Sequence, residues 1–193
     1  MFKNRNSPFY ILTLSILIIL ICPSLFQDGM FMDGQQYACV SKNLAEGNGT
    51  FWFPFLSDAW WKAGSPHFME HPPLIYGIQS IFFRLFGSSL YVERSYSFLV
   101  ALLSAYIIIK IWKLLNQDNL VYKSTGWMPI LFWILVPVCF WSYQNNMHEC
   151  TLGLFTLAAV YFIFKSISIG NSIIYFLFAG LFVFLATLSK GVP

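Results

Sequence analysis

The residues best suited to chemistry are a few charged side chains in a chain that has few of them. Asp33 lies at the start of a segment with helical spacing, where the positive end of the helix dipole would keep its carboxylate ionised. An ionised carboxylate can act as a general base toward a hydroxyl or an amine. The structural alternative is that Asp33 only caps a helix, since Asp is preferred there whatever the function.

A second group is the run Glu70-His71-Pro72-Pro73, in which a rigid Pro-Pro turn would hold two functional side chains in place. Glu70 could bind a metal or order an acceptor, and His71 could contact a phosphate or bind a metal. Because zinc usually takes three or four protein ligands, a divalent metal here would need ligands besides these two. The alternative is a solvated polar turn.

Three more charged residues complete the candidate set. The pair His148-Glu149 lies on a short polar turn and could meet the first loop across a cleft, with Glu149 as a second catalytic acid. The alternative is ordinary helix capping at the start of a span. Arg94 and Lys190 stand at the ends of apolar runs and could bind a lipid phosphate. The alternative for these cations is that their side chains extend to the membrane interface without a specific ligand.

The elements that must position these residues are membrane spans. The chain is 58% hydrophobic and 10% charged, whereas soluble domains carry about 25% charged residues. Its net charge of +3 includes no basic stripe of the kind that binds nucleic acid. We therefore predict an all-α polytopic membrane protein with spans over about 9–25, 95–115, 127–141, 150–164 and 173–188, and one long loop over 26–94.

The positive-inside rule orients these spans. Lys3 and Arg5 precede the first span, and Lys110, Lys113, Lys123 and Lys165 fall on the same predicted side, which places the N-terminus in the cytoplasm. The loop over 26–94 and all the candidate site residues then lie on the outer face.

Within the long loop, we expect two interfacial helices. The first covers residues 34–46, with Asp33 as its N-cap and Gly47 at its C-terminal end. Residues 48–65 have no clear period and should be irregular. The second helix follows Pro73 and ends at Gly87, with Leu74, Ile78, Ile81 and Leu85 on one side.

Several of these motifs resemble a known family. Met32-Asp33-Gly34-Gln35-Gln36-Tyr37-Ala38, followed by Lys42 to Gly47, is similar to the first outer loop of the GT-C glycosyltransferases, in the branch of the aminoarabinose and protein-mannosyl transferases. The acid-Lys-Pro-Pro-Leu motif of that branch is matched by Glu70-His71-Pro72-Pro73-Leu74. Further matches, in order and at fitting spacing, are Phe86-Gly87, Arg94, Glu149 and Lys190-Gly191.

This resemblance implies a GT-C-type transmembrane helix bundle that transfers a sugar from a polyprenyl-phosphate carrier. It implies that Asp33 is the catalytic base and that Glu70 helps to hold a metal together with a His from elsewhere in the protein. Here His71 stands where the family has a Lys that contacts the donor phosphate. Glu149 stands where the family usually has Asp.

We therefore predict an integral membrane glycosyltransferase of the cytoplasmic membrane, acting at its outer face by an inverting mechanism on a lipid, protein or glycan acceptor. Because the chain stops soon after an apolar run, we expect it to be the N-terminal part of one longer GT-C domain. The alternatives are a transporter, which would place charges in mid-membrane, and a non-catalytic membrane scaffold.

Overall fold

The computed structural model describes residues 6–58 and 65–191, so the predicted cationic tail at Lys3 and Arg5 and part of the irregular segment lie outside the described residues. Within these ranges the fold is all-α, as predicted, with two isolated β-bridges as the only extended pairings. The helices are α1 (Ser7–Leu25), α2 (Met32–Ala45), α3 (Leu74–Phe86), α4 (Val92–Leu115), α5 (Leu120–Lys123), α6 (Trp127–Leu135), α7 (Pro137–Gln144), α8 (His148–Ser168) and α9 (Ile173–Lys190).

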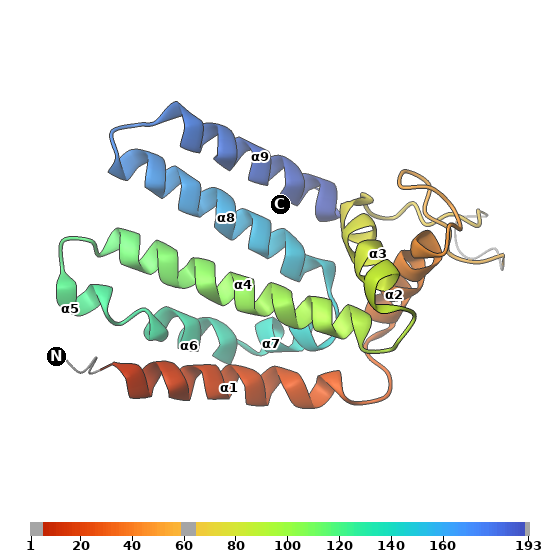
Figure 1. Cartoon of the computed structure of the whole chain (residues 1–193), viewed down its shortest axis with the longest axis horizontal. Helices are drawn as coiled ribbons and strands as arrows, with labels where there is room; N and C mark the ends of the chain where they lie inside the picture. Colours follow the sequence, from red (N-terminus) through yellow and green to blue (C-terminus); the bar gives the residue numbers. More distant parts are fainter. Residues whose placement is uncertain (1–5, 59–64, 192–193) are drawn as a thin grey trace.

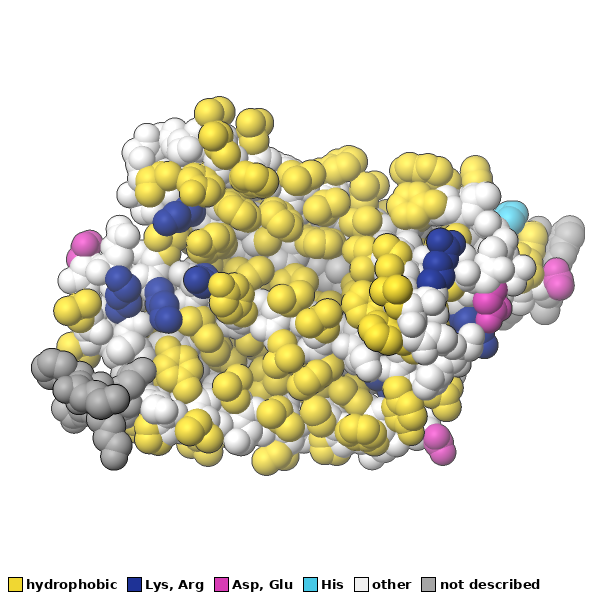
Figure 2. All heavy atoms as spheres, in the orientation of Figure 1, with side chains coloured by type: hydrophobic (Ala, Val, Ile, Leu, Met, Phe, Trp, Pro, Cys, Tyr) yellow, Lys and Arg dark blue, Asp and Glu magenta, His cyan; other side chains and the backbone are white. Residues whose placement is uncertain are grey.

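The long helices lie side by side in a bundle, and α2 and α3 pack together at one end of it (Figure 1). In the described part of the chain, α1, α4, α8 and α9 are long and apolar enough to cross a bilayer. Large hydrophobic side chains cover the middle of the bundle surface, whereas charged side chains gather toward its two ends (Figure 2). This distribution is that of a multi-pass membrane protein, because lipid-facing surfaces must be apolar.

The predicted span over 127–141 is not one straight helix. It consists of α6 and α7, which are bent by 79° relative to each other. The break falls at Val136, whose backbone is extended, just before Pro137. Proline has no N–H for a helical hydrogen bond and disfavours helical geometry in the residue before it, so α6 ends there and α7 starts in a new direction.

The start of α2 also differs from the prediction. The N-cap is Phe31, and Asp33 lies in the first turn of the helix instead of capping it. A long-range contact sets this start, because the backbone N–H of Phe31 donates a hydrogen bond to Oδ1 of Asn145 at 2.7 Å. Gly47 follows the last turn with a φ of +90°, a conformation that glycine adopts without strain.

Helix α3 begins after Pro73 and ends at Gly87, as predicted. The aliphatic side of α3 is only partly covered: Ile78 packs against the core of the bundle, whereas Ile81 and Leu85 are exposed. The buried face of the helix includes Tyr76 and Gln79. A soluble protein would bury the aliphatic side, so its exposure fits a helix that lies at a membrane interface.

A close backbone contact fixes α2 against the turn before α8. Gly34 lies so near this turn that a Cβ added to it would stand 1.9 Å from the carbonyl oxygen of Asn145. The side-chain amide of Asn146 in the same turn donates to the carbonyl oxygen of Gly34 and accepts from Nε2 of Gln79 on α3 at 2.8 Å. One turn therefore holds both helices of the loop.

This contact gives a stability prediction. Gly34→Ala should destabilise the protein by about 1–3 kcal/mol or more, because the new methyl group can be accommodated only if α2 moves away from the turn. The matched control is Gly153→Ala on α8, where an added Cβ meets no atom within 4 Å. We expect the control to unfold at the wild-type temperature or slightly above it in detergent. Equal unfolding temperatures for Gly34→Ala and wild type would contradict the backbone contact.

Candidate active site

Several predicted site residues lie around the buried side chain of Tyr37. Tyr37 is on α2, which packs with α3 at one end of the bundle (Figure 1). Burial raises the pKa of the Tyr37 phenol above its usual value, and the nearby carboxylates of Asp33, Glu149 and Glu70 raise this pKa further. The three acids come from the first turn of α2, the first turn of α8 and the loop before α3. The fold thus brings together carboxylates that are far apart in the sequence.

His71 lies directly beside Tyr37. The Tyr37 hydroxyl group and Nε2 of His71 are joined by a hydrogen bond of 3.1 Å. Burial lowers the pKa of His71, and the positive charge of Lys190 lowers it further, while the neighbouring carboxylates act in the opposite direction. His71 is therefore a neutral hydrogen-bonding group at neutral pH.

Lys190 ends α9 and reaches the same place from the other side. Its ammonium group forms an ion pair with the Glu149 carboxylate. Glu149 is about half exposed, and Lys190 is partly buried. A cation is therefore held next to the carboxylates, where it can meet the negative charge of a phosphate.

His148 precedes Glu149 in the polar turn that the sequence analysis singled out, and it lies in the same cluster. Its ring is 1% exposed and is stacked on Tyr37, with ring centroids 3.8 Å apart and planes at 20°. Among the described residues, neither ring nitrogen of His148 has a hydrogen-bond partner, and the same is true of the buried Tyr76 hydroxyl group nearby. Buried polar atoms without partners are rare and cost free energy, so this cluster is the candidate functional site.

Arg94 is placed elsewhere. Its guanidinium group is buried and donates hydrogen bonds to the carbonyl oxygens of Leu25, Gln27 and Gly29, the segment that joins α1 to α2. Nε of Arg94 lies 3.7 Å from the carboxylate of Glu93. In this structure Arg94 holds the backbone that leads into α2, and its predicted role in substrate binding stays a prediction.

The described residues do not assemble a metal centre. Within them, no group of three or more His, Cys, Asp or Glu side chains is placed to hold an ion. Glu70 is an exposed residue on the loop and could supply one carboxylate ligand at most. Residues 6–58 and 65–191 therefore do not supply a complete set of ligands for a divalent metal.

An apolar cavity of about 610 Å³ lies beside the carboxylate of Glu149. It is formed by the bend between α6 and α7 together with the first turns of α8, and Glu149 is among its lining residues, with Trp133, Trp141 and Leu157. Volumes of this size and apolar linings are typical of ligand sites. The cavity could accommodate a hydrocarbon chain whose polar head faces Glu149 and Lys190.

An apolar helix bundle with clustered carboxylates and a cation at one end fits the class of membrane glycosyltransferases. A model of the dolichyl-phosphate-mannose-protein mannosyltransferase family matches residues 70–192, and the chain belongs to this family. The match confirms the predicted resemblance to the GT-C glycosyltransferases. It includes Glu70, His71, Glu149 and Lys190, whereas Asp33 precedes it. No curated protein and no solved structure matches the chain significantly.

The charges around His71 predict how its pKa responds to substitution. Lys190→Gln should raise the pKa of His71, because a nearby positive charge is removed, and Glu70→Gln should lower it, because a nearby negative charge is removed. Glu46→Gln, an exposed carboxylate outside this group, is the matched control and should leave the pKa unchanged. NMR titration of isotope-labelled histidine measures each value.

The same pKa sets a pH dependence of stability. A histidine whose pKa is lower in the folded than in the unfolded state opposes folding when it is protonated, so its contribution to stability declines as the pH falls below about 6.5.

The substitution test has its own contradicting outcome. If the pKa of His71 changes in neither Lys190→Gln nor Glu70→Gln, these two charges do not lie close to His71.

Proposed function

We propose that this membrane glycosyltransferase transfers a sugar from a polyprenyl-phosphate donor to an acceptor at the outer face of the cytoplasmic membrane. The observation that carries the proposal is the convergence of three carboxylates and one lysine on Tyr37 and His71, next to an apolar cavity. A lipid-linked donor has a hydrocarbon chain and an anionic head, and these two features match the cavity and the cation beside it. The acceptor is a lipid, a protein or a glycan.

In this proposal Asp33 is the general base. Its carboxylate takes the proton of an acceptor hydroxyl group while the acceptor oxygen forms a bond to the anomeric carbon of the sugar. The bond from that carbon to the phosphate oxygen breaks, and its electron pair leaves with the phosphate. Attack from the side opposite the leaving group inverts the anomeric centre.

The cation and the neutral histidine serve the leaving group. Lys190 offsets the negative charge that develops on the departing phosphate, and its ion pair with Glu149 fixes its position. His71 donates or accepts a hydrogen bond at the phosphate or sugar without adding a charge. Glu149, predicted as a second catalytic carboxylate, acts in this proposal by positioning Lys190 at the side of the site that faces the apolar cavity.

The family match favours a transferase over the two alternatives predicted from the sequence, a transporter and a scaffold. The distribution of charge agrees with this preference. The acids of the site lie at helix starts and in a loop at one end of the bundle, whereas transport pathways place ionisable residues within the membrane.

Replacement of the base tests the proposal. Asp33→Asn should lower the transfer of a radiolabelled sugar from polyprenyl phosphate at least about 100-fold, because general base catalysis contributes roughly 10²–10⁴ to a rate. The assay uses the purified full-length protein reconstituted into vesicles with the donor and a membrane extract as the source of acceptor. Donor binding should change much less than the rate, since the variant keeps the size and hydrogen-bonding capacity of the side chain.

The matched control is Asp28→Asn, which changes an exposed acid in the segment before α2. It should transfer sugar at the wild-type rate. Equal rates for Asp33→Asn and wild type would remove Asp33 from the mechanism, and equal losses in both variants would point to a general effect of charge on the loop.

A further inference from the structure

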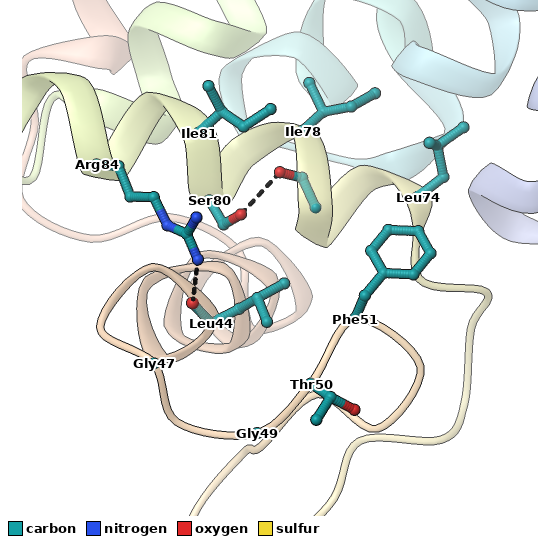
Figure 3. A pocket seen from close by; sticks show the side chains of 11 residues that line it. Leu44, Gly47, Gly49, Thr50, Phe51, Leu74, Ile78, Ser80, Ile81 and Arg84 are labelled. Atoms are coloured by element: carbon teal, nitrogen blue, oxygen red, sulfur yellow. Dashed lines mark hydrogen bonds between the residues drawn. The ribbon is translucent and has the colours of Figure 1, made fainter.

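Helix α3 and the end of α2 form a second apolar groove, separate from the cavity beside Glu149. Its volume is about 520 Å³, and its lining is largely apolar, with Leu44, Phe51, Leu74, Ile78 and Ile81. Figure 3 shows Leu74, Ile78 and Ile81 along one side of α3, and Arg84 reaching from the same helix toward the end of α2. The groove thus combines a row of aliphatic side chains with one cation.

The spacing of this row fits a hydrocarbon chain. Leu74, Ile78 and Ile81 follow each other at intervals of four and three residues, so they share one side of the helix, and Arg84 follows one turn after Ile81 and lines the same groove. Ten residues of α-helix are about 15 Å long, so an extended acyl chain can lie along the row with its polar head at Arg84. Ile81 is 54% exposed and Leu85 is 71% exposed, so this side of α3 is open.

Arg84 has donors to spare for an anionic head. A guanidinium group has five N–H donors, and here one contact is made, from Nη2 to the carbonyl oxygen of Leu44 at 3.3 Å. Among the described residues no carboxylate pairs with Arg84. The nearby acid, Glu46, is engaged by Lys42 at 3.8 Å and by the hydroxyl group of Ser88 at 3.3 Å.

At the floor of the groove, the loop that carries Phe51 lies close to the backbone of α3. Gly77 on α3 lies under the ring of Phe51, and a Cβ at this position would stand 2.6 Å from a ring carbon. The loop that carries Phe51 therefore packs directly against the α3 backbone. An acyl chain in the groove would contact α2, this loop and α3 at once.

We propose that this groove binds an anionic phospholipid of the surrounding bilayer, with an acyl chain along Leu74, Ile78 and Ile81 and the phosphate at Arg84. The occupant is a bilayer phospholipid because the groove is open along an exposed aliphatic helix side and offers one cation to one phosphate. The bound lipid fastens the α2–α3 unit, and with it Asp33 and His71, to the membrane surface. The proposal does not depend on which donor or acceptor the enzyme uses.

The test measures lipid retention and not transfer, so that its outcome is independent of the proposed reaction. Purified full-length protein is equilibrated in detergent micelles with equal parts of phosphatidylglycerol and phosphatidylcholine, and the lipids that remain bound are measured by native mass spectrometry. The wild-type protein should retain more phosphatidylglycerol than phosphatidylcholine. Arg84→Gln should lower that retention roughly fivefold, as expected for the loss of one cation near an anionic headgroup, and Arg84→Lys should keep most of it.

Two further variants separate binding from folding. Ile81→Gln changes an exposed side chain of the row without touching the hydrogen bond of Arg84, and it should lower retention of both lipids. Lys113→Gln removes an exposed cation from the last turn of α4 and should leave retention unchanged. The unfolding temperature without lipid shows whether Arg84→Gln folds. If it does not fold, lipid retention by the Ile81→Gln variant tests whether the groove binds the phospholipid.

Two outcomes would overturn the proposal. Retention of phosphatidylglycerol by the folded Arg84→Gln and Ile81→Gln variants at the wild-type level would show that the groove does not bind it. Displacement of phosphatidylglycerol by polyprenyl phosphate, with a preference that depends on Arg84, would show that the groove belongs to the donor.

Discussion

The candidate active site depends on the stacking of Tyr37 on His148. Tyr37 lies one helical turn after Asp33, and His148 directly precedes Glu149. The stack, with ring centroids 3.8 Å apart, therefore carries two carboxylates from distant parts of the chain into one place. The close approach of Gly34 to the carbonyl oxygen of Asn145 allows the rings to meet, since a larger residue would hold the two segments apart.

Grouping several carboxylates at one site costs electrostatic free energy, and the uncharged side chains of Tyr37 and His71 reduce this cost. Carboxylates that share a site repel each other, and this repulsion grows as water is excluded. Tyr37 and His71 stay uncharged at neutral pH because burial opposes their ionisation, and Lys190 contributes the positive charge. The result is a polar site at the end of an apolar bundle, in which Lys190 is the group that could meet the phosphate of the proposed donor.

Local signals in the sequence were sufficient for many elements. The apolar runs predicted the long helices, and the Pro72-Pro73 pair and Gly87 predicted both ends of α3, because proline and glycine act on the backbone of their immediate neighbours. The break between α6 and α7 has a local signal too, at Pro137, but the apolar run continues across it. Hydropathy is insensitive to helix direction, so the bend was missed.

The remaining features arise from contacts between distant segments. The start of α2 is set by Asn145, and Arg94 is engaged by the backbone that follows α1. The turn with His148 and Glu149 was expected to face the first loop, but nothing near His148 in the sequence reveals that its ring stacks on Tyr37. The acids could be chosen by type and by predicted side of the membrane. Their neutral partners became visible only in three dimensions.

A double-mutant cycle on the stacked pair tests the account most directly. Tyr37→Leu, His148→Leu and the double variant are compared with wild type by the free energy of unfolding in detergent. If the rings are stacked, the two substitutions should be coupled by about 0.5–1.5 kcal/mol. A coupling of zero, with both single variants folded, would show that α2 and the start of α8 do not meet, and the carboxylates would then have no common site.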